Sequence, residues 1–277
     1  MSAGGSADGA AAGAVSSTLL LAVGVVGGLL CICLSGFLGT LKLGILSPVI
    51  AAIGAVLAII WGSDAIRRVA SYGLGTGVPS IGYMSLSVGV ISALTGLVLA
   101  TNVLKMAIAG PIVGFVIAVI IGAIIAIVAT KIVGMKIPIM LQCTIEIAGA
   151  AALSILGFSV AIAGSYEMMP IYESVVASGY IAVLFIMCTM AIQHPFNACL
   201  GPNEDQLRTL KCAASTAFLS MTITGLMAFN VANMWAWFLV FVIGLIGWII
   251  SFRSFVLASC NDAASTKWAG LWPKVGE

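Results

Sequence analysis

The sequence predicts an all-α membrane protein that crosses the bilayer several times, and three observations carry this prediction. The 277 residues are 62% hydrophobic and only 7% charged, with a mean hydropathy of +1.23. Soluble domains carry about 25% charged residues, so this chain has too few to cover its surface in water. The apolar runs are continuous rather than alternating, which favours helices over a transmembrane barrel.

About eight apolar runs are long enough for a membrane-spanning helix, which needs roughly 20 residues. We expect these spans at 14–38, 43–62, 80–104, 106–130, 137–163, 174–194, 211–231 and 234–258. The runs are separated by charged residues or by Gly and Pro. The third and fourth runs are divided by a tight turn around Lys105, and the last two by residues 230–234. Trp235 and Trp237 are placed as interface anchors at the start of the last span.

This division gives three parts. Residues 1–13 are a flexible tail of Gly, Ala and Ser, and residues 14–258 are the transmembrane domain. Residues 259–277 are an amphipathic C-terminal tail, because Trp268 and Trp272 alternate with lysines there. We expect that tail to lie against the cytoplasmic face of the membrane or against a partner.

The basic residues predict the orientation of the helices. With eight spans, both termini lie on one side of the membrane together with nine of the eleven Lys and Arg residues. The other side retains only Lys42 and Lys105. Because cytoplasmic loops carry the excess of basic residues, the pattern places both termini in the cytoplasm of a multi-pass cell-membrane protein.

Two short strings recur at similar distances along the chain. Residues 41–46 resemble residues 135–140 at an offset of 94, and Gly82-Tyr83 resembles Gly179-Tyr180. Three spans per unit would invert the second unit, giving a three-plus-three inverted repeat with two extra helices, as in many ion-translocating proteins. Chance recurrence of Leu, Ile and Gly strings explains the same observation, so both interpretations stay open.

One carboxylate lies inside a predicted span. Glu146 is the only charged residue between Lys136 and Glu167, and it falls about 14 Å into the span 137–163, near mid-membrane. A charge at that depth is costly unless it is paired, hydrated or protonated, so it marks a functional hypothesis. Gln142 shares its helix face, and Thr144 lies close by.

These three side chains, Gln142, Thr144 and Glu146, are the candidates for ion binding. Their oxygen atoms suit a hard cation such as sodium, and protonation of Glu146 would serve proton movement equally well. A glutamate that is protonated against a neighbouring helix, or that faces a partner subunit, fits the same pattern.

Two cytoplasmic connections are candidates for subunit docking. The first carries Arg67 and Arg68 followed by three alternating glycines, Gly73, Gly75 and Gly77. The second carries His194 and Asn197, and we expect Pro195 and Pro202 to break the helix on either side of it. A flexible connection whose arginines only set the topology, and an interfacial cap around His194, are the alternatives.

The sequence contains no recognisable catalytic constellation. Its seven cysteines show no metal-ligand spacing, and its only histidine builds no zinc site or triad. The longest loop has roughly 20 residues, which leaves no room for a soluble domain. We therefore expect no catalytic residue, no bound metal other than sodium at Glu146, and covalent chemistry on another polypeptide.

Two stretches resemble a known family. Trp61–Gly82, WGSDAIRRVASYGLGTGVPSIG, and His194–Pro202, HPFNACLGP, are similar to segments of the C subunit of the tetrahydromethanopterin S-methyltransferase of methanogenic archaea. The resemblance extends over nearly the whole chain after the first dozen residues. Neither stretch carries a catalytic residue of the family onto this sequence.

The resemblance implies a role in methanogenesis and one-carbon metabolism. It implies a complex that moves a methyl group from methyl-tetrahydromethanopterin to coenzyme M through a corrinoid (cobamide) on the A subunit, coupled to sodium export. The membrane-embedded D and E subunits would be the neighbours of this chain, which would itself bind no cofactor. A stand-alone ion-coupled secondary transporter and a pure membrane scaffold are the alternatives from other classes.

Overall fold

The computed structural model describes residues 15–40, 44–70, 72, 77–198, 206–231 and 234–265. This part of the chain is helical and contains no strand, which confirms the all-α class. Seven helices are long and apolar enough to cross a membrane. An eighth crossing results if the bent pair Met168–Val176 and Tyr180–Pro195 is counted as one span.

The described part of the first half of the chain forms four long helices, if π-helical and 3₁₀ turns are counted with the helices they continue. They are α1 (Ser17–Ala22), η1 (Val23–Gly27), α2 (Gly28–Thr40), α3 (Leu46–Ala70), α4 (Gly77–Val98), η2 (Leu99–Val103), η3 (Ala107–Ala109), α5 (Gly110–Ile127) and η4 (Val128–Ile132). The second half forms α6 (Met140–Ala163), α7 (Met168–Ile171), η5 (Tyr172–Val176), α8 (Tyr180–Ala198), α9 (Gln206–Ala228) and α10 (Met234–Ser265).

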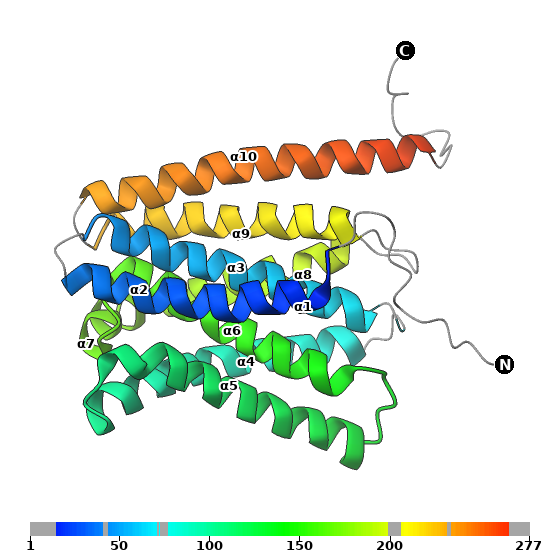
Figure 1. The fold of residues 1–277 in the computed structure, drawn as a ribbon, viewed down its shortest axis with the longest axis horizontal. Helices are drawn as coiled ribbons and strands as arrows, with labels where there is room; N and C mark the ends of the chain where they lie inside the picture. Colours follow the sequence, from blue (N-terminus) through cyan, green and yellow to red (C-terminus); the bar gives the residue numbers. More distant parts are fainter. Residues whose placement is uncertain are drawn as a thin grey trace.

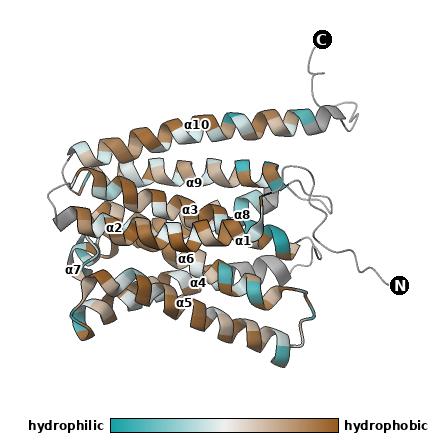
Figure 2. Cartoon of the chain, viewed as in Figure 1, coloured by the Kyte–Doolittle hydropathy of each residue, from teal (hydrophilic) through white to brown (hydrophobic). Residues whose placement is uncertain are grey.

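The helices form a bundle with α3 and α6 at its centre. Figure 1 shows α10 on one side, outside α9, and α5 on the opposite side. The start of α1 and the end of α10 lie at the same end of the bundle, and α7 lies at the other end. Apolar residues cover most of the helix surface, and polar residues gather toward the helix ends (Figure 2). This distribution is typical of helices that face lipid.

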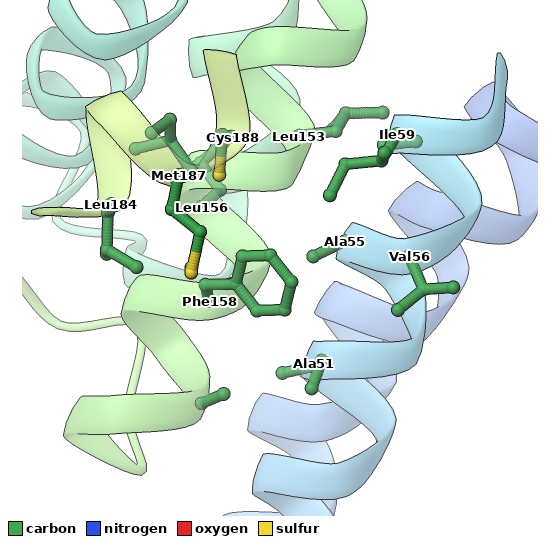
Figure 3. Close-up of a cluster of buried hydrophobic side chains, with 14 of the residues drawn as sticks. Ala51, Ala55, Val56, Ile59, Leu153, Leu156, Phe158, Leu184, Met187 and Cys188 are labelled. Atoms are coloured by element: carbon green, nitrogen blue, oxygen red, sulfur yellow. The ribbon is translucent and has the colours of Figure 1, made fainter. Parts of the chain in front are cut away.

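The core lies where α3 crosses α6. Nearly all of the apolar part of α6 is buried, 94% by residue, whereas the corresponding share for α10 is 22%. Small residues allow the close approach, since a Cβ atom on Gly157 would lie 2.7 Å from the Ala51 carbonyl oxygen and 2.9 Å from the Ala55 Cβ. Figure 3 shows Phe158 beside these alanines, with Leu184 and Met187 of α8 closing the cluster. Small residues at helix crossings are how membrane helices pack closely.

The packing repeats in part at the offset of 94 residues, and the inverted repeat stays a prediction. A Cβ atom on Gly54 of α3 would lie 2.9 Å from the Gly28 carbonyl oxygen of α2. The same pair shifted by 94 residues is Gly122 of α5 and Ala148 of α6, and a Cβ atom on Gly122 would lie 2.9 Å from the Ala148 Cβ. The central helices also have corresponding neighbours: α3 packs on α2, α6 and α8, and α6 packs on α5, α3 and α4. The correspondence ends at α4 and α5, which pack together, whereas the described parts of α2 and α8 form no comparable contact.

Several helix boundaries differ from the predicted spans: α9 begins at Gln206 instead of residue 211, and α10 ends at Ser265 instead of residue 258. Helix α3 continues to Ala70 instead of ending near residue 62, because Asp64 pairs with Arg67 and Arg68 one turn further along the same helix. The predicted span 174–194 is divided: Met168–Val176 lies at 83° to Tyr180–Pro195. Gly179, with a φ of +79°, lies at this bend, where glycine adopts the left-handed conformation easily.

The prediction that Pro195 breaks its helix is wrong, because α8 continues to Ala198. A proline removes the N–H that would bond the carbonyl four residues earlier, here that of Ala191. The Thr216 hydroxyl of α9 donates to this carbonyl oxygen at 2.9 Å. The Ser63 hydroxyl of α3 lies 3.2 Å from the next carbonyl oxygen, of Ile192, and 2.9 Å from the Ile59 carbonyl oxygen of its own helix. Side chains of neighbouring helices thus satisfy the backbone around the proline.

Candidate functional site

Glu146 lies in the second turn of α6 and is 4% exposed. Because α6 begins only at Met140, Glu146 is six residues, or about 9 Å, from the helix start. The sequence predicted a position nearer the middle of the span. The difference arises at Ile139, whose φ of +52° shows that the chain is not yet helical there. Glu146 therefore lies toward the end of the bundle that holds the termini.

Three side chains donate to the Glu146 carboxylate. Trp61 Nε1 donates to Oε2 at 2.9 Å, and Gln142 Nε2 donates to Oε1 at 2.8 Å. Arg68 Nη2 forms an ion pair with Oε2. Trp61 and Arg68 are seven residues apart, two turns of α3, so one face of that helix supplies both donors. The carboxylate is thus buried with polar partners on both oxygens.

A second buried carboxylate continues the network. Asp64 is fully buried, and its Oδ1 accepts from Arg67 Nε at 3.1 Å and Nη2 at 3.0 Å. Its Oδ2 accepts from Arg68 Nε at 3.1 Å. Arg68 therefore bridges two carboxylates, through Nε to Asp64 and through Nη2 to Glu146.

Taken as ionised, the four groups of this ion network, Asp64, Arg67, Arg68 and Glu146, have no net charge. Such a neutral arrangement satisfies the requirement that buried charges be paired. Removing one member would leave an uncompensated charge in a buried environment, which is strongly destabilising. The network therefore fixes the last turns of α3 against the first turns of α6.

The three residues predicted to bind an ion are not all brought together. Gln142 contacts Glu146, as their shared helix face indicated. Thr144 does not join them, because its hydroxyl donates to the Met140 carbonyl oxygen of its own helix at 2.8 Å. Its backbone faces α5, where a Cβ atom on Gly122 would lie 3.4 Å from the Thr144 carbonyl oxygen. A role for these three residues in ion binding stays a prediction.

The residues predicted to dock a partner fall into four groups. Arg67 and Arg68 are engaged in the ion network, with side chains only 18% and 14% exposed. His194 is exposed on α8 at the end of the bundle that holds the termini. Gly73 and Gly75 lie outside the described residues. Gly77 begins α4, and Asn197 lies in the last turn of α8.

Sequence reasoning missed Trp61, Asp64 and Gln206. The pairing of Asp64 could have been predicted, because a carboxylate three and four residues before two arginines is a recognisable pattern for ion pairs on a helix. Gln206, whose Nε2 lies 3.2 Å from Asp64 Oδ1, is 142 residues away in sequence, and no local pattern connects the two. In the described part of the chain, no group of three or more His, Cys, Asp or Glu residues is arranged to hold a metal ion.

The fold and the ion network define an integral membrane protein of the polytopic helical class, with charged groups paired at one end of its core. The family model for the C subunit of tetrahydromethanopterin S-methyltransferase matches residues 1–276. The chain therefore belongs to this family, which confirms the resemblance seen in the two sequence stretches.

Relatives named as the C subunit of tetrahydromethanopterin S-methyltransferase align over most of their length. The protein of Methanothermobacter thermautotrophicus is 55% identical over 271 residues, 98% of each chain. That of Methanosarcina mazei is 46% identical and covers 100% of this chain and 99% of its own. That of Methanopyrus kandleri is 37% identical, over 89% of this chain and 87% of its own length. The chain is thus part of a methyltransferase complex, with other subunits as partners.

Proposed function

We propose that this chain is a membrane subunit that couples methyl transfer to sodium export. The complex would transfer a methyl group from methyl-tetrahydromethanopterin to coenzyme M through a corrinoid on the A subunit, with the D and E subunits beside this chain in the cell membrane. Membership of the family supports the place in a methyltransferase complex. On this proposal the chain supplies no catalytic residue, and both termini face the cytoplasm.

The buried Glu146 carboxylate is the observation that carries the sodium part of the proposal. Its partner Arg68 is already bonded to a second carboxylate, Asp64, through a different nitrogen. Arg68 can therefore leave Glu146 without becoming an unpaired buried cation. Once Arg68 has left, the Glu146 oxygens are available to a hard cation, which prefers oxygen ligands.

Docking of a cytoplasmic domain would drive this exchange. The end of the bundle that holds the termini also holds the ion network and the exposed His194. A domain whose docking depends on the methylation state of the corrinoid would shift α3 against α6, provided that it binds the two arrangements with different affinity. Sodium would then occupy the place that the Arg68 guanidinium takes at Glu146.

The test is Glu146→Gln in the whole complex, with methyl transfer and sodium uptake into inverted vesicles measured together. We expect methyl transfer to lose its sodium dependence and sodium uptake to fall to background, because the amide carries no charge. Glu167→Gln, at the other end of α6, is the matched control and should leave coupling unchanged. Full sodium coupling in Glu146→Gln would remove this carboxylate from the ion route.

If Glu146→Gln fails to assemble, the variant Arg68→Gln with Glu146→Gln restores the charge balance of the network. Sodium coupling in that double variant would overturn the proposal and favour a scaffold. The scaffold is the second candidate, because donors within this chain already engage both Glu146 oxygens. Purification of this chain without any other subunit in mild detergent would instead favour a stand-alone transporter.

A further inference from the structure

Gln206, the first residue of α9, links two parts of the molecule that are far apart in sequence. Its side-chain Oε1 accepts from the Val15 backbone N–H at 2.9 Å, and its Nε2 donates to the Val15 carbonyl oxygen at 2.8 Å. One amide thus pairs with both polar groups of a single backbone residue. This two-point contact holds the segment that leads into α1 against the start of α9.

The same Nε2 atom also donates to Asp64 Oδ1 at 3.2 Å. A continuous series of polar contacts therefore runs from the Val15 backbone through Gln206, Asp64 and Arg68 to Glu146. It connects four segments: the approach to α1, and helices α9, α3 and α6. Asp64 is fully buried, so the amide satisfies part of a carboxylate that water does not reach.

We propose that Gln206 is a positioning residue that ties the N-terminal approach of α1 to the ion network, so that release of that segment loosens the contact between α3 and α6. The amide has one nitrogen to serve both Val15 and Asp64, so movement of Val15 changes the geometry at Asp64. This inference concerns control of the network and holds whether or not sodium passes Glu146.

Cys143 reports on the loosening. It is 1% exposed, lies one turn before Glu146, and packs against Val69, the neighbour of Arg68 in the last turn of α3. If the end of α3 separates from α6, the Cys143 thiol becomes accessible to an aqueous maleimide. Cys188 of α8 is 2% exposed and lies in the main core, so it reports on general unfolding instead.

The experiment compares Val15→Pro with Val15→Ala in the intact complex, with maleimide labelling of each cysteine followed by mass spectrometry. Proline removes the N–H that Gln206 accepts, whereas alanine keeps it. We expect Val15→Pro to raise the Cys143 labelling rate about three- to tenfold, the effect of losing one intramolecular hydrogen bond, with Cys188 unchanged. Val15→Ala should behave like the unmodified protein.

Gln206→Leu is the second variant, because it removes all three contacts and leaves Val15 unchanged. It should raise Cys143 labelling at least as much as Val15→Pro does. By reciprocity, Asp64→Asn should speed amide exchange at Val15. Unchanged Cys143 labelling in both Val15→Pro and Gln206→Leu would overturn the inference. An equal rise at Cys143 and Cys188 would also overturn it, since that result means general destabilisation.

Discussion

Arg68 holds the charge balance of the buried network, because it contacts both carboxylates. Its Nε serves Asp64 and its Nη2 serves Glu146, a division that the rigid fork of a guanidinium permits and a lysine ammonium does not. Trp61 adds a neutral donor to Glu146 without changing the charge. The site is a set of hydrogen-bond donors around two carboxylates. On our proposal, Arg68 is the donor that can leave Glu146 while it stays bonded to Asp64.

At this scale we predict that Arg68→Gln lowers the free energy of unfolding by about 3–5 kcal/mol, since it leaves two buried carboxylates with one guanidinium. The measurement is thermal or chemical unfolding of the purified complex. Arg253→Gln, at an exposed position of α10, is the matched control and should change stability by less than about 0.5 kcal/mol.

Adding Glu146→Gln to Arg68→Gln should recover part of the lost stability, because the two changes remove opposite charges that interact in the native state. Additive effects of the two substitutions would contradict the pairing of Arg68 with Glu146.

At the scale of elements, α8 shows how a neighbouring helix decides whether a proline ends a helix. The Ala191 carbonyl oxygen, which has lost its partner to Pro195, accepts from the Thr216 hydroxyl of α9. The Thr216 hydroxyl also lies 3.0 Å from the Ala213 carbonyl oxygen of its own helix, and the Thr224 hydroxyl donates to the Ser220 carbonyl oxygen at 2.9 Å. The contact between α8 and α9 therefore has a specific backbone role at one position.

We predict that Thr216→Val destabilises the protein by about 1–3 kcal/mol, because it leaves a buried carbonyl without a donor. Thr224→Val should destabilise the protein less, because the Ser220 carbonyl oxygen that accepts from this hydroxyl also accepts a backbone N–H of its own helix. In a Pro195→Ala background, the N–H of residue 195 can bond Ala191, so Thr216→Val should then cost little. A double-mutant cycle measured by chemical unfolding checks this, and a coupling energy near zero would contradict it.

At the scale of the whole molecule, the number of crossings depends on α8. The start of α1 and the end of α10 lie at one end of the bundle, which requires an even number of crossings between them (Figure 1). Seven helices qualify alone, so Tyr180–Pro195 must supply the eighth, with Met168–Val176 bent away at the far end.

We predict that Ser178→Cys and His194→Cys are labelled from opposite sides of the membrane. Ser178 and His194 are both exposed and lie toward opposite ends of α8. A membrane-impermeant maleimide should label residue 178 in intact cells and residue 194 only after permeabilisation. Asn261→Cys, exposed near the end of α10, should behave like residue 194. If residues 178 and 194 are both labelled from one side, α8 does not cross the membrane and the chain has seven crossings.

The sequence by itself determined the helical membrane class, because hydropathy and span length are local properties that the bilayer imposes on each helix separately. Helical periodicity placed Gln142 beside Glu146, and the spacing of Asp64, Arg67 and Arg68 is one that allows them to pair on a helix. The family followed from two continuous stretches.

Only the tertiary structure decided what surrounds these groups. Trp61 and Arg68 reach Glu146, Gln206 reaches Asp64, and Thr216 reaches Ala191 across helix contacts that join residues 25 to 142 positions apart. Such contacts depend on how two helices are rotated and shifted against each other. That arrangement is set by the small residues at each crossing over the whole bundle, so no single segment of the sequence encodes it.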